Sequence, residues 1–168
     1  MIEPGLTLNP DGSIRLESLD PLFVVVLREI PRLLDPDQPD AARRRLYPFP
    51  SDDDEQSQEW ERLVHPELFA LVATAQEVVR RDLEKLEIGE EGGRITIPAK
   101  HVNAWISALN VARLTLGTVH DFDEDDMEGH GPSDFGDRDM ARVKVYLMGW
   151  LQQMLIEEIH PIPEEEED

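Results

Sequence analysis

Hydrophobic residues cover nearly every side of a helix drawn through residues 105–117. The run begins at Trp105 and has few polar positions, among them Asn110 and Arg113, with Asn103 just before it. A helix that is apolar on almost all sides belongs in the interior of a fold, and its polar side chains must find partners there. The pattern therefore predicts one buried helix around which the other elements pack.

Other stretches have the apolar spacing of amphipathic helices. Asp20 is the expected N-cap of the first, with Pro21 at its first position, and Pro31 is expected to kink this helix or split off its last turn. Ser51 is the expected cap of the second. His65–Pro66 separates the second from the third, because the residue before a proline avoids helical angles. These helices are expected over residues 21–33, 51–64, 66–86 and 139–159.

The first residues alternate between apolar and polar, which predicts a β-hairpin over residues 6–16. Between its strands, Asn9-Pro10-Asp11-Gly12 has the residue order of a type I turn. A lone hairpin is marginally stable, and the β-like run Arg94–Ile97 is a candidate third strand beside it.

These elements predict a mainly α fold: a compact bundle of about four main helices around a buried central helix, with a small N-terminal antiparallel hairpin. Residues 1–160 are expected to form a single helical domain with a flexible acidic loop at 118–138, and 161–168 an acidic disordered tail. The expected core combines the central and last helices: Trp105, Leu109, Ala112, Leu116, Leu147, Trp150, Leu151 and Met154.

The net charge of the chain makes some classes of binding partner unfavourable. It has 37 acidic and 16 basic residues and a formal net charge of −21. Such a field repels phosphate, so neither nucleic acid nor an anionic membrane is an expected partner. The basic run Arg43–Arg45 is expected to be a solvated loop or to pair with nearby carboxylates, and not to bind nucleic acid. Acidity can also be an organism-wide adaptation to salt, and the ratio of 3 lysines to 13 arginines fits that or GC-rich coding.

The chain has no cysteine, which excludes disulfides, thiolate metal sites and thiol nucleophiles. It opens without the basic start and apolar run of a signal peptide, and its longest apolar run, Leu22–Leu27, is far too short to span a bilayer. We therefore expect a cytoplasmic protein.

The acidic segment after the central helix is the first candidate for metal chemistry. Asp121, Asp123 and Asp125 alternate as at the start of a calcium loop. However, the sixth position is Asp126 where glycine is needed, and the twelfth is Pro132 where a glutamate is needed. We interpret the segment as a solvated run of charge.

His120, Asp121, Asp123 and His130 are ligand types that suit a transition metal, but their spacing follows no helix face and preorganises no geometry. We expect no metal and no cofactor.

Nucleophilic catalysis has weak candidates. Ser107 with His101 or His65 is the best pairing, and no Gly-x-Ser-x-Gly turn surrounds any serine. The glycine-rich run Gly89–Gly93 lacks the lysine of a phosphate-binding loop. We therefore assign no catalytic residue.

Asn110 and Arg113 stand three residues apart on the central helix, so they can contact the same neighbour. A buried arginine needs a carboxylate or several carbonyls. Two interpretations remain open: an internal clamp between helices, and a pocket for a ligand or peptide that Tyr146 and Gln152 join. The expected carboxylate partners are Glu157, Glu158 or an acid within Asp52–Asp54.

Two blocks carry a resemblance. They read Trp105-x-x-Ala-Leu-Asn110-x-x-Arg113-Leu-x-Leu-Gly117 and Tyr146-x-x-x-Trp150-Leu-Gln152-x-x-Leu155. They resemble a bacterial family of unknown function, often encoded beside the proteolysis adaptor ClpS, in which some members are labelled regulators. Tyr47-Pro48 and Glu59-Trp60 are similar to its middle part. The resemblance implies no activity, and it makes these the candidate binding residues: Trp105, Asn110, Arg113, Tyr146, Trp150 and Gln152.

The function predicted is that of a non-enzymatic interaction or regulatory protein with a protein partner, which the resemblance links to ClpS and Clp proteolysis. The alternative is a small-molecule or metal-dependent enzyme that uses the Asn110/Arg113 region or the acidic loop at His120. The sequence leaves the oligomeric state open.

Overall fold

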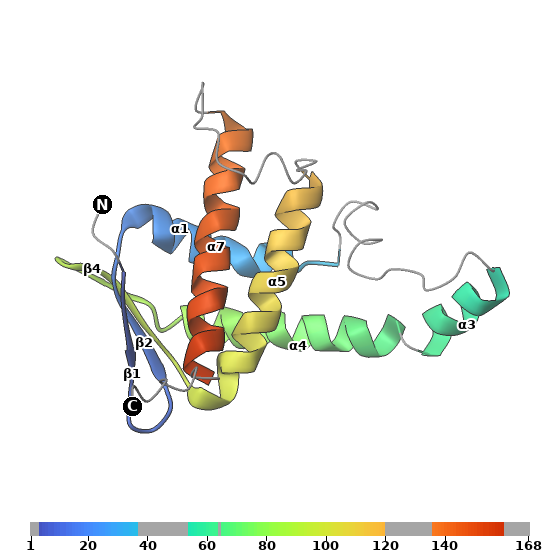
Figure 1. Ribbon diagram of the computed structural model, residues 1–168, viewed down its shortest axis with the longest axis horizontal. Coiled ribbons are helices and arrows are strands. Elements are labelled where there is room, and N and C mark those ends of the chain that lie inside the picture. Colours follow the sequence, from blue (N-terminus) through green and yellow to red (C-terminus); the bar gives the residue numbers. More distant parts are fainter. Residues whose placement is uncertain (1–3, 37–53, 64, 120–135, 160–168) are drawn as a thin grey trace, which may run out of the picture.

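A computed structural model describes residues 4–36, 54–63, 65–119 and 136–159. The fold is mainly helical with a small antiparallel sheet, which confirms the predicted class (Figure 1). Within the described ranges, no helix is both long and apolar enough to cross a membrane. In chain order the elements are β1 (Gly5–Leu8), β2 (Ile14–Leu19), α1 (Pro21–Leu33), α3 (Asp54–Leu63), α4 (His65–Leu83), β3 (Glu87–Gly89), β4 (Gly92–Ile97), the 3-10 helix η1 (Ala99–His101), α5 (Val102–Val119) and α7 (Asp137–Ile159).

The predicted N-terminal hairpin is confirmed. β1 and β2 are antiparallel, with Leu6 opposite Leu16. The backbone N–H of Gly12 donates to the carbonyl of Asn9 at 2.9 Å, which closes the turn. Gly12 has φ of 85°, a left-handed conformation that glycine adopts without steric cost.

The sheet is larger than the sequence predicts. Its four strands run in the order β1-β2-β4-β3, so the candidate third strand is present as β4 and β3 is an additional edge strand. The β2–β4 register places Ile14 opposite Ile97 and Leu16 opposite Ile95. All four side chains are buried while the intervening Thr96 is exposed, so one face of the sheet packs on the helices and the other faces solvent.

Helix α1 begins as predicted but does not split. Oδ1 of Asp20 accepts a 2.8 Å hydrogen bond from the backbone N–H of Phe23, and Pro21 occupies the first turn. The helix then continues through Pro31 to Leu33. The carbonyl of Pro31 accepts a hydrogen bond from Nε2 of Gln76 at 2.8 Å, which ties this end of α1 to α4.

Other boundaries differ by a few residues. α4 ends at Leu83, three residues before its predicted end, and residues 84–86 form turns. α5 extends to Val119 and α7 begins at Asp137, so both helices include residues of the predicted acidic loop. Several predictions lie outside the described residues: the Ser51 cap, the Arg43–Arg45 loop, residues 120–135 with His120 and His130, and the 161–168 tail.

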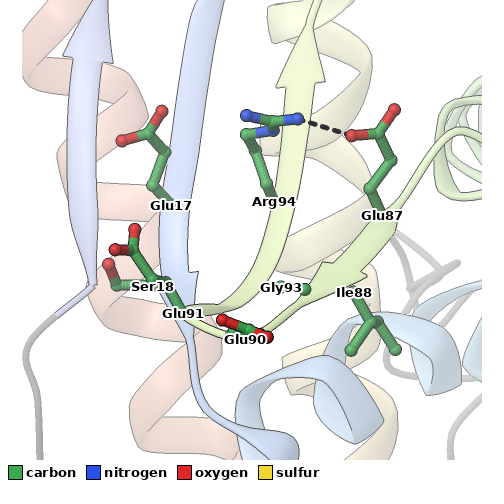
Figure 2. Close-up of a pocket in the computed structure, with 10 residues that line it drawn as sticks. Glu17, Ser18, Glu87, Ile88, Glu90, Glu91, Gly93 and Arg94 are labelled. Carbon is green, nitrogen blue, oxygen red and sulfur yellow. Dashed lines mark hydrogen bonds and ion pairs between the residues drawn. The ribbon is translucent and has the colours of Figure 1, made fainter.

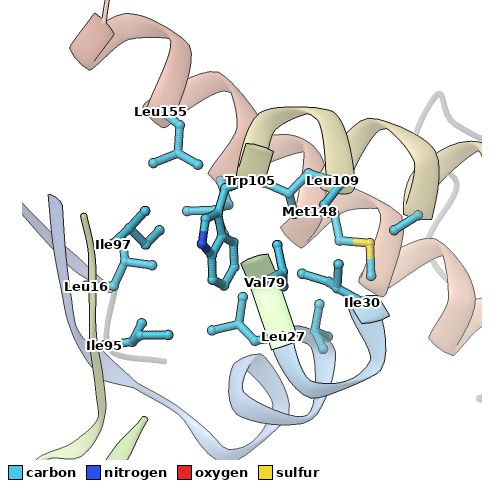
Figure 3. Close-up of a cluster of buried hydrophobic side chains, with 14 of the residues drawn as sticks. Leu16, Leu27, Ile30, Val79, Ile95, Ile97, Trp105, Leu109, Met148 and Leu155 are labelled. Carbon is cyan, nitrogen blue, oxygen red and sulfur yellow. The ribbon is translucent and has the colours of Figure 1, made fainter. Parts of the chain in front are cut away.

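Figure 3 shows the core around Trp105, whose side chain is completely buried. It lies among residues of the sheet, such as Ile97, of α1, such as Leu27, and of α7, such as Leu155. Helix α5 contacts α1, α4 and α7. Of the predicted core, Trp105, Leu109, Ala112, Leu116 and Leu151 are buried, and Leu147 and Trp150 are partly buried against them.

One predicted core residue of α7 is wrong. Met154 is half-buried and lines a groove, while Val145, Met148 and Leu155 are buried. The buried side of α7 is therefore rotated from the predicted one.

Candidate functional site

Helices α5 and α7 lie side by side (Figure 1). Residues of both helices line a groove on the surface. We call it the α5–α7 groove; it has a volume of about 530 Å³. It brings together five of the six candidate binding residues, and Trp105 is the exception. Its lining residues are Asn110, Arg113, Val145, Tyr146, Gly149, Trp150, Gln152, Gln153, Met154 and Ile156.

Arg113 crosses from α5 to α7 at the middle of this groove. Its Nη1 donates a 2.7 Å hydrogen bond to Oε1 of Gln152. Nε2 of Gln152 in turn donates to the carbonyl of Ile106 at 3.4 Å, so the glutamine bridges two points of α5. Gly149 makes room for the guanidinium, because a Cβ atom there would lie 3.3 Å from Cζ of Arg113.

The partner of Arg113 is an amide and not the expected carboxylate. Among the described residues, no ion pair includes Arg113, and its Nε is buried without a hydrogen-bond partner. Glu157 instead accepts a hydrogen bond from Gln153 at 3.2 Å.

Apolar and amide groups surround this cation. Tyr146 and Ile156 are 69% and 36% exposed. Trp150 is partly buried, with its ring edge-on to Phe23 at a centroid distance of 6.0 Å and an interplanar angle of 87°. Asn110 is exposed on the α5 side.

This set of groups has a definite chemical character. Arginine and amide side chains offer hydrogen-bond donors to carboxylates and carbonyls, and Tyr146 offers an apolar ring. Among the residues that the structure describes, the groove lining includes no carboxylate, histidine, serine or lysine. The arrangement is suited to binding.

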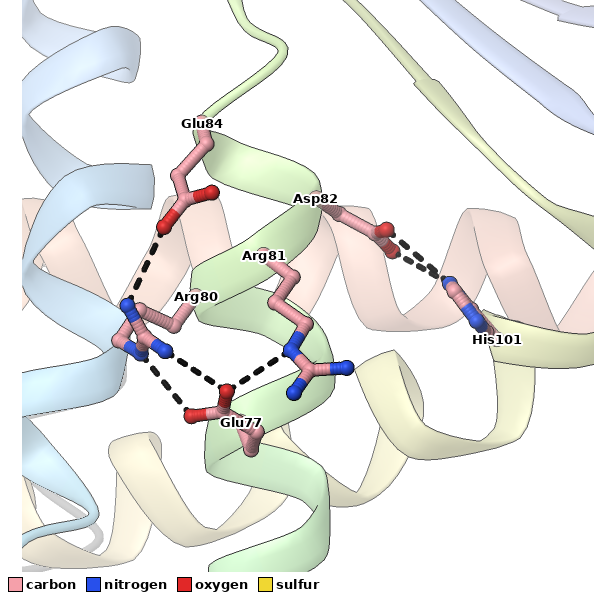
Figure 4. Close-up of polar contacts among 6 residues, drawn as sticks. All are labelled: Glu77, Arg80, Arg81, Asp82, Glu84 and His101. Carbon is pink, nitrogen blue, oxygen red and sulfur yellow. Dashed lines mark hydrogen bonds and ion pairs between the residues drawn. The ribbon is translucent and has the colours of Figure 1, made fainter.

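Trp105 belongs to a different constellation, which the sequence analysis missed. Its Nε1 donates a 2.9 Å hydrogen bond to Oδ2 of Asp82, whose side chain is 2% exposed. Nδ1 of His101 lies 3.0 Å from both carboxylate oxygens of Asp82 (Figure 4). His101 of the candidate serine–histidine pair therefore contacts Asp82. Ser107, the candidate nucleophile, is exposed on α5. The sequence contained one indication that Asp82 is buried: at helical spacing it lies on the apolar stripe of α4 with Ala75 and Val79.

The neighbouring residues of α4 form an exposed ion-pair cluster (Figure 4). Glu77 pairs with Arg80 at 2.6 Å and with Arg81 at 2.8 Å, the second being the pair that helical spacing predicts. The hydrogen bond from Arg80, followed by that from Arg81, holds the pKa of Glu77 below its usual range. These charges satisfy one another on the surface.

Metal ligands do not gather in the described part of the chain, where no three His, Asp or Glu side chains form a group able to hold an ion. The candidate ligands His120, Asp121, Asp123 and His130 lie outside it.

Comparison with known proteins identifies the family. No curated protein and no solved structure gives a significant match to the chain. One family model does match, over residues 9–159, a span that runs from the hairpin turn to the last residue of α7. The chain therefore belongs to the family described as a domain of unknown function (DUF2017).

Proposed function

We propose that this protein is a non-enzymatic interaction protein that binds a protein partner in the α5–α7 groove. The observation that carries the proposal is the state of Arg113. The chain has more than two acidic residues for every basic one, yet in the described structure this half-buried arginine has no ion pair and an unbonded Nε. A half-buried guanidinium with an unbonded Nε and no carboxylate is incompletely stabilised, which is a reason to expect that a partner supplies the anion.

The rest of the groove fits a protein surface. Tyrosine and arginine are enriched among the few residues that carry most of the binding energy at protein interfaces. A carboxylate can make two parallel hydrogen bonds to an arginine, and the ring of Tyr146 can pack against an apolar neighbour of that carboxylate. The partner segment we propose therefore carries an aspartate, glutamate or C-terminal carboxylate next to an apolar side chain.

We further propose a link to regulated proteolysis. Its support is the resemblance of the Trp105 and Tyr146 blocks to a family encoded beside the adaptor ClpS. The ClpS protein of the same organism, and the Clp subunits, are therefore the first partners to test.

The experiment is affinity enrichment from host lysate with the full chain as bait, read by mass spectrometry, followed by calorimetric titration with purified ClpS. Tyr146→Ala and Arg113→Gln baits remove the ring and the charge of the groove. Leu71→Ala is the matched control, because Leu71 is also a large exposed side chain, 66% exposed, on α4. We expect defined proteins to be recovered with the chain itself and the control, and to be lost with both groove variants.

Two results would refute the proposal. Recovery that is unchanged in both groove variants places the contact elsewhere. Enrichment of nothing over background, together with stoichiometric metal or a tightly bound metabolite in the purified protein, supports the alternative enzyme that uses the Asn110/Arg113 region or the His120 loop.

A further inference from the structure

A second cleft lies where the β3–β4 turn, Glu90 and Glu91, meets the start of α1. Two glycines, Gly92 and Gly93, allow the turn to pack closely against β2 and α1. A Cβ atom on Gly92, which has φ of 100°, would lie 2.6 Å from the carbonyl oxygen of Leu19. A Cβ on the buried Gly93 would lie 2.8 Å from Cγ2 of Val24. The backbone of the turn is thus packed directly on β2 and α1, and it forms one wall of a cleft of about 640 Å³.

The side of this cleft next to α1 is apolar and open. Val25 of α1 is 48% exposed and Ile88 of β3 is 63% exposed, and both line the cleft. Figure 2 shows Ile88 on the opposite side of the strand from Glu87. Two exposed aliphatic side chains in one cleft are an apolar anchor point that the described chain leaves uncovered.

An acidic pocket adjoins the cleft (Figure 2). It shares Glu90 and Glu91 with the cleft and is also lined by Glu17, Glu87 and Arg94. Glu87 is neutralised by Arg94, at 2.6 Å, and Glu17 by Arg15, also at 2.6 Å. Glu90 and Glu91 are exposed, and within the described ranges neither makes an ion pair. The turn therefore presents two negative charges without an ion pair beside the apolar anchor. Among the described residues that line the cleft, Asp20 is a further acid and Arg28 of α1 is the one cation.

The backbone adds a third feature. β3 is the last strand in the order β1-β2-β4-β3, so one side of it has no neighbouring strand in the sheet. An extended segment can pair with such an edge through main-chain hydrogen bonds, and its alternate side chains then point to the two sides. Beside this edge strand, Ile88 and Val25 are available for contact with aliphatic side chains. Glu90 and Glu91 of the turn are available for contact with basic ones.

We propose that the β3–β4 cleft binds an extended basic segment of a partner protein in which lysine or arginine alternates with aliphatic residues. The aliphatic side chains pack on Val25 and Ile88, and the basic ones pair with Glu90 and Glu91. This interaction goes beyond the proposed function, because the cleft shares no lining residue with the α5–α7 groove.

The test uses the full chain and a fluorescent ten-residue peptide of alternating lysine and leucine, with anisotropy measured at physiological salt. A lysine–serine peptide keeps the charge and removes the apolar side chains. The protein variants are Glu90→Gln/Glu91→Gln and Ile88→Ser. The matched control is Glu59→Gln/Glu67→Gln, which changes the net charge equally at exposed positions of α3 and α4.

We expect Kd for the lysine–leucine peptide to rise about tenfold in Glu90→Gln/Glu91→Gln, as two exposed ion pairs would give. Ile88→Ser should raise Kd about fivefold or more through lost apolar contact. The control double variant and Tyr146→Ala should leave Kd within about twofold of the unmodified chain, as surface changes away from a contact do.

Three results would overturn the proposal. If the control double variant weakens binding as much as Glu90→Gln/Glu91→Gln, the peptide follows net charge and not the cleft. If the lysine–serine peptide binds as tightly as the lysine–leucine peptide, the apolar anchor is not used. Absence of measurable binding also rejects the cleft, whatever the outcome for the α5–α7 groove. Circular dichroism melts of every variant show that each is folded.

Discussion

The indole Nε1 of Trp105 donates a 2.9 Å hydrogen bond to the carboxylate of Asp82, and both side chains are buried. This contact joins α5 to α4, and Nδ1 of His101, 3.0 Å from the same carboxylate, adds a second donor. A buried carboxylate is tolerated when donors satisfy its oxygens. The three side chains therefore act as one polar connection inside the helical core.

We predict that Asp82→Ala lowers the free energy of unfolding by about 3 kcal/mol, because it leaves a buried indole N–H without an acceptor. Asp82→Asn should cost less, since its amide oxygen still accepts from Trp105. Urea unfolding followed by circular dichroism measures both. Glu84→Ala, which breaks an exposed pair with Arg80 on the same helix, is the control and should change stability by less than about 1 kcal/mol. An equal loss in Asp82→Ala and the control would contradict the role of the buried contact.

The correct predictions came from local signals. The order Asn9-Pro10-Asp11-Gly12 specifies a turn within four residues, and Asp20 caps a helix that starts at the next residue. Asp82 was missed because its partners are 19 and 23 residues away. Its position on the apolar stripe of α4 indicates that it is buried but does not identify those partners. β3 was missed because its three residues are too short to show alternation.

The rotation of α7 has a related cause. Apolar residues occur on more than one side of this helix, so the periodicity alone allows Met154 or Met148 to face inward. Packing against α5 and α1 decides between them. In the candidate site, the two sequence blocks identified five of the groove residues. The contacts of Arg113 with Gln152 and Gly149 join two helices, and no local pattern reveals them.

The contact between Gly149 and Arg113 predicts a coupled effect on stability. In an Arg113→Ala background, Gly149→Ala should stabilise the protein by about 1 kcal/mol, because alanine is the better helix former. In the unmodified background the new Cβ meets the guanidinium at 3.3 Å, so the gain should be smaller or reversed. A double-mutant cycle from urea unfolding should give a coupling energy above about 0.5 kcal/mol. Additive effects would show that the guanidinium moves aside freely.

The Glu77 cluster predicts how stability depends on pH. Hydrogen bonds from Arg80 and then Arg81 lower the pKa of Glu77 in the folded state. A lowered folded pKa means that this stabilisation is fully present above the ordinary glutamate pKa, about 4.3, and is lost as the pH falls through the lowered value. Glu77→Gln should therefore unfold at a lower temperature near neutral pH, and should lose less of its melting temperature between about pH 5 and pH 3. Melting curves for both proteins across that range make the comparison. Parallel pH profiles would show that the ion pairs contribute nothing in solution.

The hydroxyl of Thr115 predicts a stabilising substitution. The side chain is completely buried in α5, and its Oγ1 has no hydrogen-bond partner in the described structure. Valine has the same shape without the polar atom, so Thr115→Val removes an unsatisfied group and leaves no cavity. We expect the free energy of unfolding to rise by about 1 kcal/mol.

Thr118→Val is the matched control for that substitution. Thr118 lies on the same helix, and its hydroxyl donates a 2.8 Å hydrogen bond to the carbonyl of Leu114. Replacing it removes a satisfied bond, so stability should stay the same or fall. If Thr115→Val destabilises the protein, its hydroxyl has a partner in solution, most simply the carbonyl of Val111 one turn earlier. The signs of the two changes in the free energy of unfolding therefore decide whether the buried hydroxyl of Thr115 destabilises the folded protein.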